Sequence, residues 1–165
     1  MAMETSRPSK EYQDVLAFHQ KFKQLCPNTV GHLTAVKLRQ RIDFMQEELD
    51  EFSQASAGQD LAGQADALVD LVYVAIGTAV QLGLPWDQLW DDVQRANMAK
   101  EVGVTKRGYA HDVCKPPGWE GPRTKEVLAS NGYQVSQWFR AHSPNTGYPT
   151  YFIVEKARDD ATGNE

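Results

Sequence analysis

Two long helical segments separated by only four residues constrain this fold more than any other feature of the sequence. Apolar residues recur at helical spacing from about residue 34 to residue 56, and again from about residue 61 to residue 82. In the break between them, Gly58 can end the first helix and Asp60 can cap the second. So short a connection forces neighbouring helices to run antiparallel. The sequence therefore predicts a helical hairpin.

Shorter helical segments flank this hairpin. The spacing of apolar residues predicts one helix over residues 11–26, which Pro27 would end, and another over residues 86–101 after a Gly-Leu-Pro break. We therefore expect an all-α fold, a bundle of four principal helices with an irregular C-terminal appendix. Residues 125–130 can add a turn or two of helix, and residues 151–154 form one β-like run.

The second helix of the hairpin is apolar nearly all round after Asp70, which is typical of a buried central helix or an interface helix. One hairpin and two shorter helices leave part of this surface uncovered. We therefore expect the chain to form a homodimer or a homotetramer.

Length and composition indicate one globular domain, since the chain has 165 residues, of which 41% are hydrophobic and 24% charged. We expect residues 1–10 to be a disordered lead, residues 11–130 the domain and residues 131–165 an extension with a disordered end. No membrane-length apolar run, signal peptide or cysteine framework is visible, so the expected location is the cytoplasm, without a membrane partner. The net charge of −5 disfavours a nucleic-acid partner.

Acidic side chains gather on both helices of the predicted hairpin. Glu47, Glu48 and Glu51 span only about 100° of arc on the first helix. Asp66 and Asp70 share one face of the second. Glu51 and Asp66 lie equally far from the middle of the break. Glu47 and Asp70 are mirrored in the same way, so two facing helices would bring the carboxylates together at two matched levels.

Such a gathering of like charges calls for a counter-ion, because neighbouring carboxylates repel one another and lose hydration. A hard divalent cation such as Mg²⁺, with Mn²⁺ as a substitute, suits a donor set made only of oxygens. Asp70 supports this reading, because it stands among apolar residues where a purely structural helix would carry another apolar side chain. The alternative is a non-catalytic helical interaction protein with a solvated acidic face, which would gain no thermal stability from the metal.

The predicted helix over residues 86–101 carries polar residues where its apolar stripe should continue. The spacing of Trp86, Trp90 and Val93 leads on to Asn97 and Lys100. A lysine suits a phosphate group, and an amide suits a phosphate, a sugar or a base edge. Carboxylates for a metal together with cations for phosphates are what a nucleoside triphosphate with Mg²⁺ requires.

Two other classes of site lack their motifs. A di-iron bundle needs Glu-x-x-His, but no glutamate stands three residues before any of the four histidines. P-loop chemistry needs Gly-x-x-x-x-Gly-Lys, which is also missing from the sequence.

Four segments in order resemble the MazG-like all-α nucleoside triphosphate pyrophosphatases, over about residues 11–130. The segments are Glu47-Glu48-x-x-Glu51, Asp66-Ala67-Leu68-Val69-Asp70-Leu71-Val72-Tyr73, Ala96-Asn97-Met98-Ala99-Lys100 and Lys115-Pro116-Pro117-Gly118-Trp119. The last two are similar to motifs of the phage-type branch, which is related to phosphoribosyl-ATP pyrophosphohydrolase. The family pattern continues as ExxD, but Ala67 holds its first position here, so Asp66 would take that role.

The resemblance implies that the protein hydrolyses an NTP or a dNTP to the monophosphate and pyrophosphate, for control of nucleotide pools. It implies five Mg²⁺ ligands, namely Glu47, Glu48, Glu51, Asp66 and Asp70. A water activated by the ion would attack the α-phosphorus, and Glu47 or Glu48 would accept its proton.

The resemblance also implies substrate contacts from Asn97, Lys100 and Lys115, with Lys100 steadying the phosphates. His19 on the first helix, beside Phe18, suits a nucleobase, because an aromatic surface with a polar edge matches that ligand. The phage-type branch includes enzymes that prefer guanine nucleotides, although no residue in the sequence identifies the base.

Overall fold

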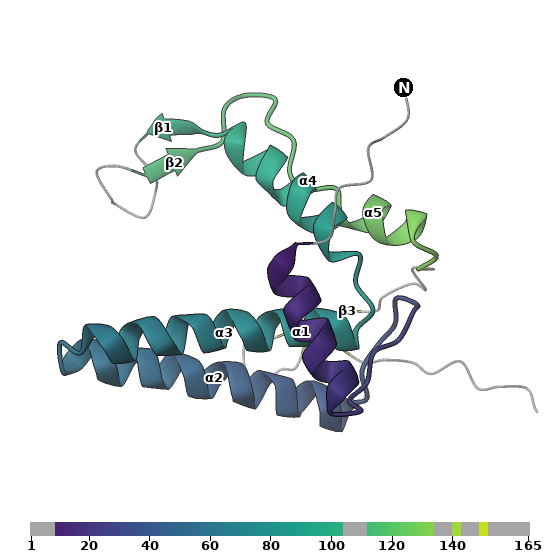
Figure 1. Ribbon diagram of the computed structural model, residues 1–165. Helices are drawn as coiled ribbons and strands as arrows, with labels where there is room; N and C mark the ends of the chain where they lie inside the picture. Colours follow the sequence, from purple (N-terminus) through teal and green to yellow (C-terminus); the bar gives the residue numbers. More distant parts are fainter. Residues whose placement is uncertain (1–8, 104–111, 134–139, 143–148, 152–165) are drawn as a thin grey trace, which may run out of the picture. The chain divides into compact units, whose positions relative to one another are not determined.

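The computed structural model describes residues 9–103, 112–133, 140–142 and 149–151. The helices of this described part are α1 (Lys10–Lys21), α2 (Ala35–Ala57), α3 (Leu61–Gln81), α4 (Trp86–Met98) and α5 (Thr124–Ser130). The described strands are short, namely β1 (Glu101–Gly103), β2 (Asp112–Cys114), β3 (Arg140–His142) and β4 (Pro149–Tyr151). The protein is therefore all-α, as the sequence predicts (Figure 1).

Contacts divide the chain into two units, residues 1–133 and residues 134–165. The first unit contains all five helices and the antiparallel pair β1–β2, and the second contains the antiparallel pair β3–β4. The expected disorder of both chain ends concerns residues that lie largely outside the described ranges, as does most of the β-like run over residues 151–154.

The α2–α3 hairpin forms as its sequence predicts, and Figure 1 shows the two helices lying side by side. The backbone turns at Gln59, which has a positive φ of 55°. The Asp60 carboxylate then caps α3 by accepting hydrogen bonds from the backbone N–H groups of Ala62 and Gly63, each at 3.1 Å. At the far end of α2, the Thr34 hydroxyl accepts a hydrogen bond from the Lys37 N–H at 3.3 Å. Local capping chemistry thus sets both the length of α2 and the point at which α3 begins.

The prediction for the first helix is wrong at its C-terminal end. The helix α1 ends at Lys21 rather than at Cys26, because Lys23 adopts a positive φ of 52° that a helix cannot contain. The fourth helix is also shorter than predicted, since α4 ends at Met98 and β1 begins at Glu101.

The hydrophobic core lies where α1 packs against the second half of α3. Its buried centre consists of Val15, Ile76 and Val80, with Tyr73 and Trp86 partly buried against it. Trp86 begins α4, and the Asp87 carboxylate beside it accepts a hydrogen bond from the Ser9 N–H at 2.9 Å. The start of α4 is therefore attached to α1 and α3.

A polar group is buried beside this core. The Arg41 side chain, only 7% exposed, donates from Nε to the Thr78 hydroxyl at 3.0 Å and from Nη2 to the Val74 carbonyl at 2.7 Å. Gly77 makes room for it, because a Cβ atom there would lie 2.9 Å from His19 Nε2 and 3.1 Å from Arg41 Nη2. Arg41 thus fastens α2 to α3 with hydrogen bonds to neutral groups.

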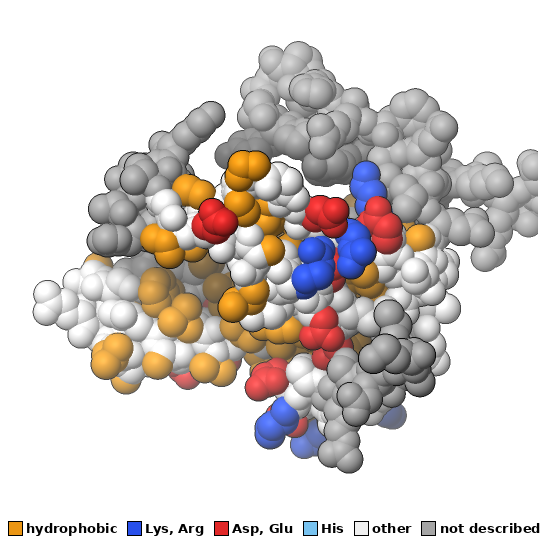
Figure 2. Space-filling model, turned by 90° about the horizontal axis from the view of Figure 1, so that it is seen from above, with side chains coloured by type: hydrophobic (Ala, Val, Ile, Leu, Met, Phe, Trp, Pro, Cys, Tyr) orange, Lys and Arg blue, Asp and Glu red, His pale blue; other side chains and the backbone are white. Residues whose placement is uncertain are grey.

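Burial along α3 is concentrated near its C-terminal end, and Ala67 is an isolated buried residue in the first half. Ile76 to Gln81 are mostly buried, whereas Val72 is 52% exposed and Val69 more so. Hydrophobic side chains are also visible on the molecular surface in Figure 2. By length and composition alone α3 could cross a membrane, a test that core helices of soluble proteins also pass.

Candidate active site

The α2–α3 hairpin carries the predicted carboxylates on both of its helices. Glu47 and Glu51 are exposed on α2, and Glu48 between them is half-buried. Asp66 and Asp70 are exposed on the first half of α3, between the turn and the hydrophobic core. The polar half of the hairpin therefore presents these side chains to solvent.

Glu48 shows that the five carboxylates share one electrostatic neighbourhood. Burial raises the pKa of the Glu48 carboxyl above its ordinary value, and the negative charges of the other four residues raise it further. Those four are, in order of effect, Glu51, Asp70, Glu47 and Asp66. The other four predicted metal ligands therefore lie near enough to act on the charge of Glu48, a residue that the sequence analysis did not single out among the five.

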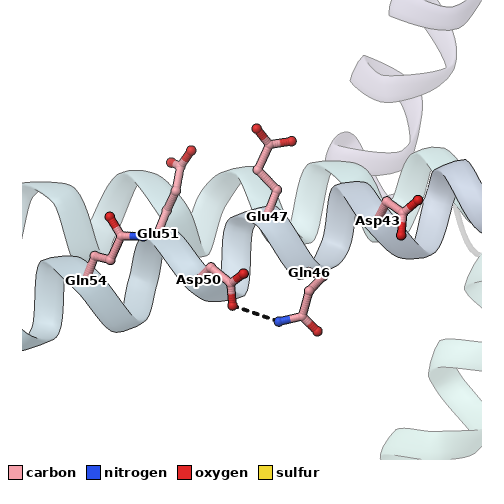
Figure 3. Close-up of a pocket in the computed structure, with 6 residues that line it drawn as sticks. All are labelled: Asp43, Gln46, Glu47, Asp50, Glu51 and Gln54. Atoms are coloured by element: carbon pink, nitrogen blue, oxygen red, sulfur yellow. Dashed lines mark hydrogen bonds between the residues drawn. The ribbon is translucent and has the colours of Figure 1, made fainter.

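An open hollow of ≈ 470 Å³ runs along the acidic face of α2. It is lined by Asp43, Gln46, Glu47, Asp50, Glu51 and Gln54. In Figure 3, Glu47 and Glu51 extend to the same side of the helix. Asp50 instead accepts a hydrogen bond of 2.8 Å from Gln46, and Asp43 pairs with Arg39 at 2.8 Å. Glu47 and Glu51 therefore carry the less compensated charges of this face.

The donor set of this cluster fits a hard divalent cation, because it consists only of carboxylate oxygens. Within the described ranges, however, the side chains as they stand do not place three such groups close enough to hold a metal ion. Exposed carboxylates on adjacent helical turns reach a shared ligand by rotating about their side-chain bonds. The residues thus match the ion in chemistry and charge, whereas the side-chain positions are not those of a formed site.

The predicted phosphate contacts come together in a second group, at the end of α4. Lys100 Nζ donates a hydrogen bond to Asn97 Oδ1 at 2.8 Å. Lys100 and Lys115 both lie over the indole of Trp119, with their Nζ atoms 5.8 Å and 4.5 Å from the ring centroid. In the part of the chain that the structure describes, no hydrogen bond or ion pair joins these lysines to the carboxylates of the hairpin. Sequence reasoning quoted Trp119 within a motif but gave it no role.

His19 lies in the protein interior rather than on an open aromatic surface. Its side chain is 3% exposed, and its Nδ1 atom has no hydrogen-bond partner. Burial lowers the pKa of His19 and the nearby positive charge of Arg41 lowers it further, while the Leu25 carbonyl acts in the opposite direction. The adjacent Phe18 packs edge-on against Tyr73 at 5.6 Å between ring centroids. A contact between His19 and a nucleobase stays a prediction.

The comparison with known families covers the helical part of the chain. The model of the phosphoribosyl-ATP pyrophosphohydrolase family matches residues 15–97, which is half of the sequence. The matched span begins in α1, includes the hairpin with all five carboxylates and ends at Asn97. Lys100, Lys115 and Trp119 lie beyond it. A search of curated proteins finds no match.

Members of this family are all-α, typically metal-dependent enzymes that hydrolyse a phosphoanhydride bond of a nucleotide. The described helices and the carboxylates on the hairpin agree with that chemistry. The chain therefore belongs to the phosphoribosyl-ATP pyrophosphohydrolase family, within the MazG-like all-α superfamily of nucleotide pyrophosphohydrolases.

Proposed function

We propose that this protein is a Mg²⁺-dependent diphosphohydrolase that converts an NTP or a dNTP to the monophosphate and pyrophosphate. The observation that carries the proposal is the presence of five carboxylates on the facing helices α2 and α3, four of which raise the pKa of the fifth, Glu48. Mutual repulsion of this kind destabilises a fold unless the charges are compensated, and a bound divalent cation would compensate them. The family match supports the class of reaction.

The proposed ligands of the ion are Glu47, Glu48, Glu51, Asp66 and Asp70, and Mn²⁺ would substitute for Mg²⁺. When bound, the ion would neutralise phosphate charge and make a water molecule more acidic. An adaptor with a solvated acidic face remains the alternative. Such an adaptor would show no increase in melting temperature with millimolar Mg²⁺ or Mn²⁺, because only binding to the folded state stabilises it.

The chain's own residues would divide the remaining work. In the proposed reaction a water oxygen bonds to the α-phosphorus, the bond to the bridging oxygen breaks, and pyrophosphate leaves. Glu47 or Glu48 accepts the proton of the attacking water, which is a role that a nearby carboxylate can fill. Lys100 and Lys115 hold the phosphates, and Asn97 contacts a phosphate, the sugar or the base edge. His19 contributes to base recognition, and the resemblance to the phage-type branch favours guanine as the base.

Exposed apolar side chains support the proposed homodimer or homotetramer. Val69 and Val72 on α3 are more than half exposed, on the helix that also carries Asp66 and Asp70. Exposed apolar surface of this kind is typical of an interface between subunits. Light scattering at tens of micromolar protein should give at least the dimer mass, and a monomer mass would contradict this assembly. The cytoplasm is the proposed location.

A substrate screen tests the proposed reaction. The eight common NTPs and dNTPs are incubated with the protein and Mg²⁺, together with phosphoribosyl-ATP, the nucleotide that names the family. We expect a monophosphate and pyrophosphate from at least one triphosphate, and none without a divalent ion. Hydrolysis of phosphoribosyl-ATP alone, or release of orthophosphate, would contradict the proposal.

Lys100→Ala tests the assigned phosphate contact. The substitution removes an ammonium but leaves the carboxylates intact, so we expect kcat/KM to fall by about tenfold or more through the loss of a charged hydrogen bond. Unchanged kcat/KM would contradict the role of Lys100.

A further inference from the structure

Lys100 and Lys115 occupy opposite positions at one end of the β1–β2 pair. The register pairs Glu101 with Cys114, so the next residue beyond the ladder on each side is a lysine. Like charges that face each other across antiparallel strands destabilise the pairing. Among the residues that the structure describes, neither ammonium forms an ion pair with a carboxylate. The two ammonium groups therefore lie near each other without a carboxylate partner, and Lys100 donates a hydrogen bond to the neutral Asn97 side chain.

Trp119 contacts both lysines, because both ammonium groups lie over its ring. A cation near an aromatic face is attracted by the negative charge distribution of that face. The indole is itself held in place, since its N–H donates to the Ala96 carbonyl at 2.7 Å. Ala96 is fully buried in the last turn of α4. One ring thus connects the end of α4 to both lysines.

The sequence between Lys115 and Trp119 explains how the ring is presented. The backbone N–H of Trp119 donates to the Pro116 carbonyl at 3.0 Å, and Gly118 between these residues has a positive φ of 77°. Proline followed by a glycine with positive φ is the pattern of a type II turn. The turn folds the chain back, so that Trp119 lies against the lysine that precedes the turn.

We propose that Trp119 is a positioning residue that holds Lys100 and Lys115 side by side as a two-ammonium clamp for the oxygens of a phosphoanhydride. The inference rests on the proposed function, which assigns both lysines to the substrate, and it adds the indole as the group that makes them act as a pair. A phosphoanhydride carries negative charge on adjacent phosphates, so it matches two neighbouring ammonium groups better than a single phosphate does.

Direct binding of pyrophosphate tests the clamp without any turnover. Isothermal titration of the full chain with pyrophosphate, at low salt and without a divalent ion, should give a weaker Kd for Trp119→Leu than for the unaltered chain. We expect about a tenfold loss, since the ring stabilises two cations. Trp119→Phe keeps an aromatic face but loses the N–H, so its Kd should fall in between. Orthophosphate should bind more weakly than pyrophosphate.

Trp90→Leu is the matched control, because Trp90 is a 60% exposed tryptophan on α4, the helix whose last turn Trp119 contacts. Its Kd for pyrophosphate should equal that of the unaltered chain. If Trp119→Leu and Trp90→Leu bind pyrophosphate equally well, or if the unaltered chain does not bind it, the clamp is wrong. Because this assay needs no substrate turnover, its result stands even if the nucleotide screen fails.

Turnover and a second variant complete the test. With an active substrate, Trp119→Leu should raise KM about tenfold and leave kcat within about twofold, since the ring is proposed to act on the substrate only through the two lysines. Gly118→Ala strains the turn at a positive φ and should weaken pyrophosphate binding without replacing the indole. Far-UV circular dichroism should show unchanged helix content for both variants. An unchanged Kd for Gly118→Ala, or a fall in kcat alone for Trp119→Leu, would overturn the proposal.

Discussion

The two ends of the α2–α3 hairpin differ sharply although they belong to the same two helices. At the open end, α1 covers α3, and the contacts involve buried residues such as Val15, Ile76 and Val80. Toward the turn, the side chains of both helices are mostly exposed, and carboxylates converge on Glu48. The open end supplies apolar burial, which stabilises the fold. The turn end carries electrostatic repulsion between carboxylates, which destabilises the fold.

This difference indicates that stability and chemistry are separated along the hairpin. A substitution at the turn end should change function with little loss of stability. A substitution at the open end should do the reverse. Three experiments can break or sharpen this separation.

The largest effect is expected at the turn end. Asp70→Asn and Glu51→Gln each remove one charge with little change in shape, so activity should fall by about a hundredfold or more. The melting temperature without metal should hold or rise, because repulsion is relieved. The shift produced by Mn²⁺ should shrink for both variants, since fewer ligands bind the ion.

Thermal melts with and without Mn²⁺, alongside turnover, measure these effects. A purely acidic surface predicts the opposite pattern, with near-normal turnover and the same metal-induced shift in each variant. Near-normal turnover or an unchanged metal-induced shift, in either variant, would show that the carboxylate cluster is not the catalytic centre.

An effect on stability is expected at the open end. In Gly77→Ala, the new Cβ would lie 2.9 Å from His19 Nε2 and 3.1 Å from Arg41 Nη2. Overpacking costs up to about 3 kcal/mol and higher helix propensity returns about 1 kcal/mol. We therefore expect a net loss of about 2 kcal/mol in the free energy of unfolding, measured by urea denaturation.

Gly58→Ala at the turn is the control for this substitution. Its Cβ would meet backbone oxygens at 3.6 Å and 3.7 Å, which is ordinary contact, and its φ of −81° suits any residue. The variant should be as stable as the unaltered chain or more stable by a few tenths of a kcal/mol. Equal destabilisation by both substitutions would show that the two ends do not differ as described.

The smallest effect concerns the pH dependence of the free energy of unfolding, to which the two ends of the hairpin should contribute with opposite signs. His19 has a lowered pKa, so the unfolded chain binds its proton first, and this part of the stability is lost as pH falls below about 6.5. Glu48 has a raised pKa, so its contribution is lost as pH rises above about 4.5. We measure the free energy of unfolding by urea denaturation between pH 4 and 8. His19→Gln should reduce its decrease toward low pH, and Glu48→Gln should reduce its decrease toward high pH. Slopes that neither variant alters would contradict both assignments.

Capping and charge pattern are local, which is why much of the hairpin could be predicted from the sequence. Asp60 caps α3 as expected, and the mirrored carboxylates lie near enough to raise the pKa of Glu48. The helix α1 ends early for a reason that hydrophobic periodicity does not contain, since the positive φ of Lys23 depends on the path of the following chain.

Long-range contacts account for what the sequence did not show. His19 is buried because Gly77 on another helix leaves space for its ring. Trp119 gains its position from the Ala96 carbonyl, 23 residues earlier in the chain. Neither partner could be identified from spacing, because each pair is brought together only by the folded arrangement of separate elements.

The brevity of the hairpin turn has a consequence for how this protein could vary in length. Surface turns are usually where chains accept insertions. Here each added residue that continued a helix would rotate the following side chains by about 100° and advance them by about 1.5 Å. Asp66 and Asp70 on α3 would then turn away from Glu48 on α2. The length of the turn over residues 58–60 therefore sets where Asp66 and Asp70 lie relative to Glu48, and a change of length here should disrupt the carboxylate cluster.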